Sequence, residues 1–139
     1  LLAREGLAAM VERKLLLLEL LLELHRHQQV DAVQQHPDRA ILRAMAWMQE
    51  QYPRPKLTIA DCAAAAGLST SHFRRRFAAQ TGRSPKDFLT AVRIAQAKML
   101  LSQGQPIKEV AAAVGYANLF HFMRQFRRIT GQTAGQFRN

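Results

Sequence analysis

The chain contains, at Ile107–Phe137, the stretch IKEVAAAVGYANLFHFMRQFRRITGQTAGQF, which is an edited copy of Ile59–Phe88, IADCAAAAGLSTSHFRRRFAAQTGRSPKDF. Matching residues lie 48 positions apart up to the central glycine and 49 positions apart after it, so the second copy has one extra residue just after Gly115. A length change confined to this point indicates two helices joined by a short turn. The sequence therefore predicts two helix-turn-helix units in one chain.

The composition of the 139-residue chain favours an all-α fold, because residues that form helices readily are abundant and β-branched residues are few. The formal net charge of +10 is unevenly distributed. Residues 36–139 carry sixteen Lys/Arg and five Asp/Glu, a net +11, whereas residues 1–35 carry four Lys/Arg and five Asp/Glu. A strongly basic domain favours a polyanionic partner, nucleic acid before membrane. The alternative is a basic surface that serves only solubility.

The single cysteine, Cys62, occupies the position that Val110 has in the second copy, so we expect a buried apolar residue and not a nucleophile. One cysteine allows no internal disulfide, which fits a reducing cytoplasm. The sequence has no metal-ligand cluster. We therefore expect no metal, no cofactor and no catalytic site.

A leucine-rich helix is predicted over residues 1–30, within a first region delimited as residues 1–35. Apolar residues recur at helical spacing along one stripe: Val11, Leu15, Leu18, Leu22. The leucine run is about half the ~20 residues that a membrane span requires, and Glu19 and Glu23 interrupt it, so no membrane association is expected. We expect the helix to dimerise or to end a sensor domain that precedes Leu1. The alternative is burial against the chain's own helices.

The second region is delimited as residues 36–139, with the boundary placed near residues 31–37. Its first helix-turn-helix is predicted at about 57–81, a connector helix at about 84–102 and the second helix-turn-helix at about 106–130. Thr58 and Asp61 form a capping box that starts the first unit. Helical spacing predicts that the connector buries the following residues: Phe88, Leu89, Val92, Ala95, Met99, Leu100.

The second helix of each unit has an outward face. In the first unit Phe73 and Phe77 must point inward, which turns Ser71 and Arg75 outward, with Arg74 beside them. In the second unit the inward residues are Phe122 and Phe126, and the residues turned outward are Phe120 and Arg124. Phe120 either contacts thymine methyl groups or folds back over Leu119, and the sequence favours neither.

Two such units joined by a helix resemble the DNA-binding domain of the AraC/XylS family of bacterial transcription regulators. The residues that carry this resemblance are IADCAAAAGLS at 59–69, FRRRF at 73–77, TGRSPKDF at 81–88, RIAQAKMLL at 93–101, AAAVGYAN at 111–118, FHFMRQFRRITG at 120–131 and Phe137-Arg138. The resemblance covers about residues 38–139. In one departure, Ala134 stands where the family usually has Pro, which weakens the start of the last helix slightly.

The resemblance implies a seven-helix domain whose second helix in each unit enters the major groove of double-stranded DNA. It assigns base reading to six residues: Ser71, Arg74, Arg75, Phe120, His121, Arg124. Six other residues are expected to contact phosphates, where charge matters and base identity does not: Thr70, His72, Arg76, Asn118, Arg127, Arg128. Among these, Arg75 and Arg124 are the main candidates, because one guanidinium can bond O6 and N7 of guanine together; the alternative for both is a phosphate contact or a surface ion pair.

The resemblance also implies an activator that places RNA polymerase beside its site in the bacterial cytoplasm, at the nucleoid. Two other functions remain open from the sequence. A non-specific architectural DNA-binding protein needs the same charge without the two reading faces. The DNA-reading module of an alkylation-repair enzyme needs an exposed, reactive cysteine, whereas Cys62 is predicted to be buried.

Overall fold

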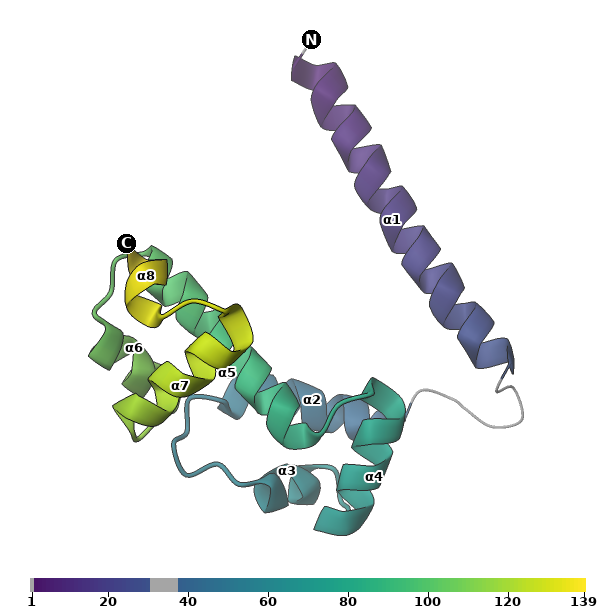
Figure 1. The fold of residues 1–139 in the computed structure, drawn as a ribbon. Coiled ribbons are helices and arrows are strands. Elements are labelled where there is room, and N and C mark those ends of the chain that lie inside the picture. Colours follow the sequence, from purple (N-terminus) through teal and green to yellow (C-terminus); the bar gives the residue numbers. More distant parts are fainter. Residues whose placement is uncertain (1, 31–37) are drawn as a thin grey trace. The chain divides into compact units, whose positions relative to one another are not determined.

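The computed structural model describes residues 2–30 and 38–139, and within the first of these ranges the side chains of residues 6–24 (Figure 1). These residues form helices joined by turns and loops and contain no strand, which confirms the predicted all-α class. The chain divides into two units, Leu1–His36 and Pro37–Asn139, which are described separately. The boundary predicted near residues 31–37 lies outside the described residues.

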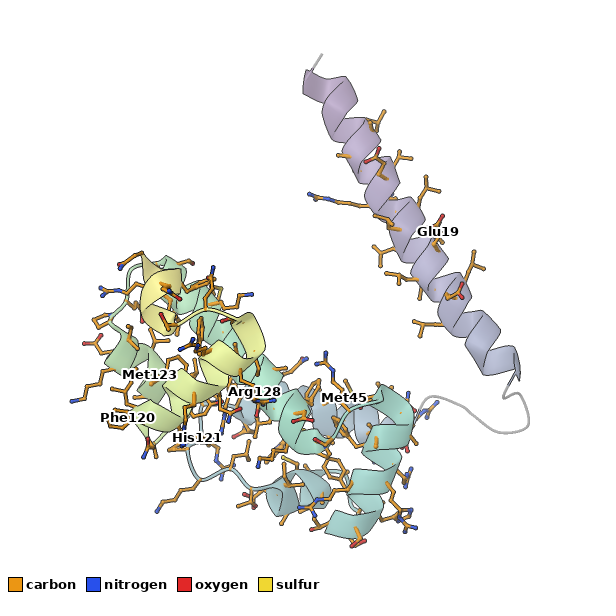
Figure 2. All side chains as sticks on the ribbon, in the orientation of Figure 1. Glu19, Met45, Phe120, His121, Met123 and Arg128 are labelled. Carbon is orange, nitrogen blue, oxygen red and sulfur yellow. The ribbon has the colours of Figure 1, made fainter. Side chains whose placement is uncertain are left out.

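The described residues of the first unit form the helix α1 (Leu2–Val30), as the sequence predicts. Its apolar side chains are exposed on every side of the helix, including the stripe that was singled out above: Val11, Leu15, Leu18, Leu22. Glu19 lies on the same helix (Figure 2). No helix in the described part of the chain is long and apolar enough to cross a membrane.

The second unit contains seven helices, the number that the resemblance implies. They are α2 (Arg39–Gln51), α3 (Ile59–Ala65), α4 (Thr70–Thr81), α5 (Pro85–Ser102), α6 (Ile107–Ala113), α7 (Leu119–Thr130) and α8 (Ala134–Arg138). The long helix α5 runs through the middle, with α3 and α4 at one end and α6 and α7 at the other (Figure 1). It has 18 residues, or about 27 Å at 1.5 Å per residue.

Side-chain caps start α3, α4 and α7, and the cap of α3 is the predicted one. At α3 the Thr58 hydroxyl accepts the Asp61 N–H at 3.1 Å, while the Asp61 carboxylate accepts the Thr58 N–H at 3.0 Å. Ser69 caps α4 and Asn118 caps α7, each by accepting the N–H three residues on. The turn between α6 and α7 is one residue longer than the turn between α3 and α4, which confirms the insertion after Gly115.

The last helix, α8, has an N-terminal cap although Ala134 replaces the proline that is usual in the family. Thr133 accepts the N–H of Gln136 at 3.1 Å, and the Gln136 side chain accepts the N–H of Thr133 at 3.0 Å. This capping box satisfies two N–H groups that a helix start otherwise leaves unpaired. It therefore supports the start of α8 despite Ala134.

Two hydrophobic cores share α5. The first core contains the following residues: Ile41, Ala44, Met48, Leu57, Cys62, Ala63, Ala66, Phe73, Phe77, Leu89. The second contains these: Ile94, Ala97, Leu101, Val110, Ala111, Val114, Tyr116, Phe122, Phe126, Ala134. The N-terminal part of α5 packs into the first core, and the rest of the helix packs into the second.

The face that α5 buries matches the predicted one only in part: Leu89 is buried, and three other predicted residues, Phe88, Val92 and Leu100, are partly buried. Ala95 and Met99 are exposed, and Ile94, Ala97 and Leu101 are buried instead. The reason is that α5 turns different faces to two cores, so a single stripe drawn from its N-terminal end does not continue along the helix. The buried face of α5 corresponds to that of α2, because buried residues of the two helices match at a separation of 53 positions: Ile41/Ile94, Ala44/Ala97 and Met48/Leu101.

Candidate nucleic-acid interface

The outward face of α4 carries three exposed polar side chains that sequence analysis assigned to base reading: Ser71, Arg74, Arg75. Beneath them Phe73 and Phe77 are fully buried and contact each other edge to face, with ring centroids 5.5 Å apart. The buried pair fixes the rotation of α4 about its axis, because turning the helix would expose both rings. Ser71 and Arg75 therefore point away from the core, as predicted.

The outward face of α7 is built in the same way over Phe122 and Phe126, both fully buried. Arg124 is exposed at the position equivalent to Arg75. Phe120 keeps 72% of its surface exposed, so it does not fold back over Leu119, and the first of its two alternatives remains. Figure 2 shows Phe120 and Met123 on the N-terminal half of α7. This face thus combines a cation with exposed apolar groups.

The two flanks of α7 line different grooves. A groove of about 670 Å³ lies on one flank, and its lining includes Phe120, Met123, Arg124 and Arg127. A second groove, of about 530 Å³, lies on the other flank, between the two helix-turn-helix units. Its lining includes His121, Gln125 and Arg128 of α7, together with Lys86 of α5 and Thr58, which caps α3. The three residues predicted to read bases from α7 are therefore divided, with His121 apart from Phe120 and Arg124.

His121 has an aromatic neighbour within the protein. Its ring meets the edge of the Tyr116 ring with centroids 5.4 Å apart and planes at 79°. Tyr116 belongs to the longer second turn and is only 7% exposed. The imidazole thus packs against Tyr116 at the start of α7, while His121 remains exposed.

Arg76, which was assigned to phosphate, has a partner that the sequence did not reveal. Its guanidinium donates two hydrogen bonds of 2.7 Å to the Asp38 carboxylate, from Nε and Nη2. Asp38 also caps α2 by accepting the N–H of Ile41, so the ion pair ties α4 to the start of α2. The equivalent residue of the second unit is Gln125, whose side chain accepts two hydrogen bonds from Arg128 at 2.8 and 3.0 Å.

The hydrogen bonds from Arg76 hold the pKa of the Asp38 carboxyl below its usual value of 3.8. A carboxyl whose pKa is lower in the folded chain stabilises the fold above the unfolded pKa and loses that effect as pH falls through the folded pKa. Arg76 is 37% exposed, so solvent screens the pair. Asp38→Asn keeps the helix cap, and we expect it to lower the free energy of unfolding at pH 7 by about 0.5–1 kcal/mol.

Urea unfolding of wild type and Asp38→Asn between pH 7 and pH 2 checks this expectation. The difference should begin to shrink as pH falls below about 3.8, the value in the unfolded chain, and should vanish below the lower pKa of the folded chain, where the wild-type carboxyl is neutral as well. Glu50→Gln, which removes an exposed acid from the same helix, is the matched control and should have no such effect. A difference that stays constant down to pH 2 would show that the charge of Asp38 is not its source.

The other predicted phosphate residues lie around the two reading helices. His72 on α4 is exposed and Thr70 is partly exposed, while Asn118 is exposed with its Oδ1 engaged as the cap of α7. Arg127 and Arg128 are exposed in the last turn of α7. Sequence analysis missed Arg83, which lies with Arg128 in a small cavity of about 220 Å³ beside α5. The basic residues therefore extend from α7 to the start of α5.

The outward faces of α4 and α7 are built in the same way, and basic side chains surround both. Together with the shared helix α5, they define a tandem helix-turn-helix DNA-binding fold. A family model described as a helix-turn-helix domain matches residues 62–139, more than half of the chain. The chain belongs to the AraC/XylS family of transcription regulators.

The relatives agree with this assignment. A putative AraC-like transcription regulator of Streptomyces antibioticus is 30% identical over 122 residues, which are 84% of this chain and 40% of that protein. The transcriptional activator Btr of Bacillus subtilis is 36% identical over 76 residues, 54% of this chain and 14% of that protein. The chain thus spans less than half the length of either relative.

A solved structure shows the same fold in contact with DNA. The DNA-binding domain of AdpA, in complex with a target DNA, matches with a TM-score of 0.67 and 28% identity, over 75% of this chain and 91% of that one. This chain and that DNA-binding domain therefore share a fold.

Proposed function

We propose that this chain is the DNA-reading part of a sequence-specific transcription regulator, with α4 and α7 entering adjacent major-groove segments of one duplex. The observation that carries the proposal is that Arg75 and Arg124, at equivalent positions of the two units, are both exposed above a buried phenylalanine pair. An α-helix fits the major groove, and a guanidinium there bonds O6 and N7 of guanine. The DNA complex of AdpA supports the use of this fold on DNA.

Each unit then reads its own element. Ser71, Arg74 and Arg75 supply hydrogen-bonding groups from α4. On α7, Arg124 supplies a cation and Phe120 contacts the methyl group of thymine. His121 contacts the DNA from the flank of α7 that is nearer the first unit. Phosphate contacts fall to residues around the reading faces: Thr70, His72, Asn118, Arg127, Arg128. We add Arg83 and Lys86 to these and place Arg76 last, because its guanidinium is already paired.

Binding-site selection from random duplexes, with the whole chain at a stated salt concentration, tests the proposal. Two helices on one DNA face should read two unlike elements about ten base pairs apart, one helical turn. A specific regulator should prefer its selected site over competitor DNA by about 10³-fold or more. Recovery of no preferred sequence would support a non-specific architectural protein instead.

The third possibility, an alkylation-repair enzyme, lacks support in the structure. Cys62 is fully buried, as predicted, and its Sγ–H donates to the carbonyl of Thr58 at 3.3 Å. Burial raises the pKa of the thiol to about 11, so it stays protonated at neutral pH. A reactive cysteine needs the opposite, a lowered pKa and access to substrate. The named relatives are transcription regulators.

We propose that the whole protein acts as an activator in the bacterial cytoplasm, at the nucleoid, by placing RNA polymerase beside its site. The support is the name of one relative, the transcriptional activator Btr. Transcription in vitro with purified polymerase from a promoter that carries the selected site tests the direction. A fall in transcript would make the protein a repressor.

We propose further that α1 dimerises through the stripe that contains Val11, Leu15, Leu18 and Leu22, all exposed within their own unit. A helix that is apolar on every side is stable in water only when it is covered. Analytical ultracentrifugation should give a dimer for the whole chain and a monomer after removal of residues 1–30. If both the whole chain and the shortened chain sediment as monomers, α1 does not dimerise and has a packing role instead.

A further inference from the structure

Arg93, on the middle of α5, belongs to neither reading face, and sequence analysis gave it no role. Its guanidinium donates from Nε to the carbonyl of Tyr52 at 2.9 Å and from Nη2 to the carbonyl of Arg54 at 2.9 Å. Both carbonyls belong to the segment that ends α2 and leads to α3, inside the first helix-turn-helix half. The side chain is partly buried, so these two bonds are shielded from much of the competing water.

The same guanidinium also contacts the second half of the domain. It lies over the ring of Tyr116, 5.5 Å from the ring centroid, in a cation–π arrangement. Gly115, just before Tyr116, has φ +99°, and a Cβ there would stand 2.5 Å from the carbonyl oxygen of Tyr52. We call these five residues the joint: Tyr52, Arg54, Arg93, Gly115, Tyr116.

The side chain of Tyr52 shows that the joint belongs to both halves. It packs against the first core and against the second. The contact lies at the longer second turn, in which Tyr116 is buried, whereas the equivalent Leu68 of the first turn is only partly buried. The two halves of the domain are thus in contact beside the point at which the two sequence copies differ in length.

The joint is directly linked to the start of α7. The Tyr116 ring contacts the rings of His121 and Phe122, each with centroids 5.4 Å apart. These two residues form the first turns of α7, where a reading helix meets the DNA. A shift of Tyr116 would therefore move the N-terminal end of α7 relative to the first unit.

We propose that Arg93 is a positioning residue that fixes α7 relative to α4 and thereby sets the one spacing of DNA elements that the protein accepts. The inference rests on the proposed two-element reading. The continuous helix α5 fixes the distance between the units along its own axis. The bonds of Arg93, to two carbonyls of one unit and to an aromatic ring of the other, oppose rotation of the units about that axis. A planar guanidinium can do this, whereas an ammonium cannot reach both carbonyls with a fixed fork.

The test measures binding of the whole chain to the selected site and to versions with one or two base pairs inserted or deleted between the elements. Wild type should lose roughly tenfold or more in affinity for each altered spacing, because a rigid pair of readers cannot engage both elements at once. For Arg93→Ala the loss should fall to about threefold or less, while binding to the original site weakens about tenfold. Binding to each single element should stay within about twofold of wild type.

Two variants separate positioning from other effects. Arg93→Lys keeps the aliphatic stem and the charge but not the fork, so it should show an intermediate spacing profile, and it decides the question if Arg93→Ala does not fold by circular dichroism. Arg43→Ala removes an exposed arginine from α2, outside the joint, and should keep the wild-type profile. If folded Arg93 variants lose affinity at altered spacings as strongly as wild type does, the inference about Arg93 is wrong, while the proposed function stands. A wild type that binds one element as well as two would overturn the proposed function, and the inference with it.

Discussion

Replacement of Gly115 by alanine is expected to lower the free energy of unfolding by about 2–4 kcal/mol. Two costs add at this position. The backbone has φ +99°, which side chains of L-residues rarely adopt, and the new Cβ would stand 2.5 Å from the carbonyl oxygen of Tyr52 and 3.0 Å from Nε of Arg93. Relief of the clash requires the Tyr52 carbonyl to move, which also strains its hydrogen bond to Arg93. Urea unfolding followed by circular dichroism measures the loss.

Gly67→Ala is the matched control, because Gly67 takes the equivalent place in the first turn. Its φ is +70°, but a Cβ there would meet no atom within 4 Å. We expect it to cost about 1–2 kcal/mol, the conformational part alone. Equal losses for the two variants would mean that the close approach to Tyr52 contributes nothing to stability.

Arg75→Ala and Arg124→Ala are each expected to weaken binding to the selected site by about 1–3 kcal/mol, which is roughly 5- to 150-fold. Each variant should lose its sequence preference at a different position of the site, because the two residues lie on different reading helices. The removed guanidinium leaves a guanine without its bidentate partner, while the rest of the interface is unchanged. Repeated selection with each variant identifies the relaxed position.

The matched variant for both is Arg127→Ala, which removes an exposed arginine from α7 that is assigned to phosphate. It should weaken binding to all sequences alike and lower the salt dependence of binding by about one unit of slope. If Arg75→Ala and Arg124→Ala behave as Arg127→Ala does, both residues contact phosphate, and base reading must be assigned to other side chains.

The sequence was sufficient to predict the features that depend on local patterns. The repeat at 48 and 49 positions identified both helix-turn-helix units and the longer second turn. The capping box of Thr58 and Asp61 and the buried phenylalanine pairs followed from spacing alone, because a cap and a helix face are decided within a few residues. The outward positions of Arg75 and Arg124 followed from the same pairs.

Features that depend on contacts between distant segments were not predicted. Asp38 lies 38 residues from Arg76, and neither residue reveals the other in the sequence. The roles of Arg93 and Tyr52 depend on backbone carbonyls, which leave no trace in a pattern of side chains. The C-terminal part of the buried face of α5 differs from the prediction for another reason: α5 packs on two cores with two faces, and one helical stripe describes only one of them.

The division of α5 between two cores has a thermodynamic consequence. In arrays of repeated modules each module contributes its own stability and adds a term for contact with its neighbour. Here the neighbours share a continuous helix, with Leu89 in one core and Ile94, Ala97 and Leu101 in the other. Unfolding of either half would expose part of that helix to water, so we expect the two halves to unfold together and damage to one half to lower the stability of both.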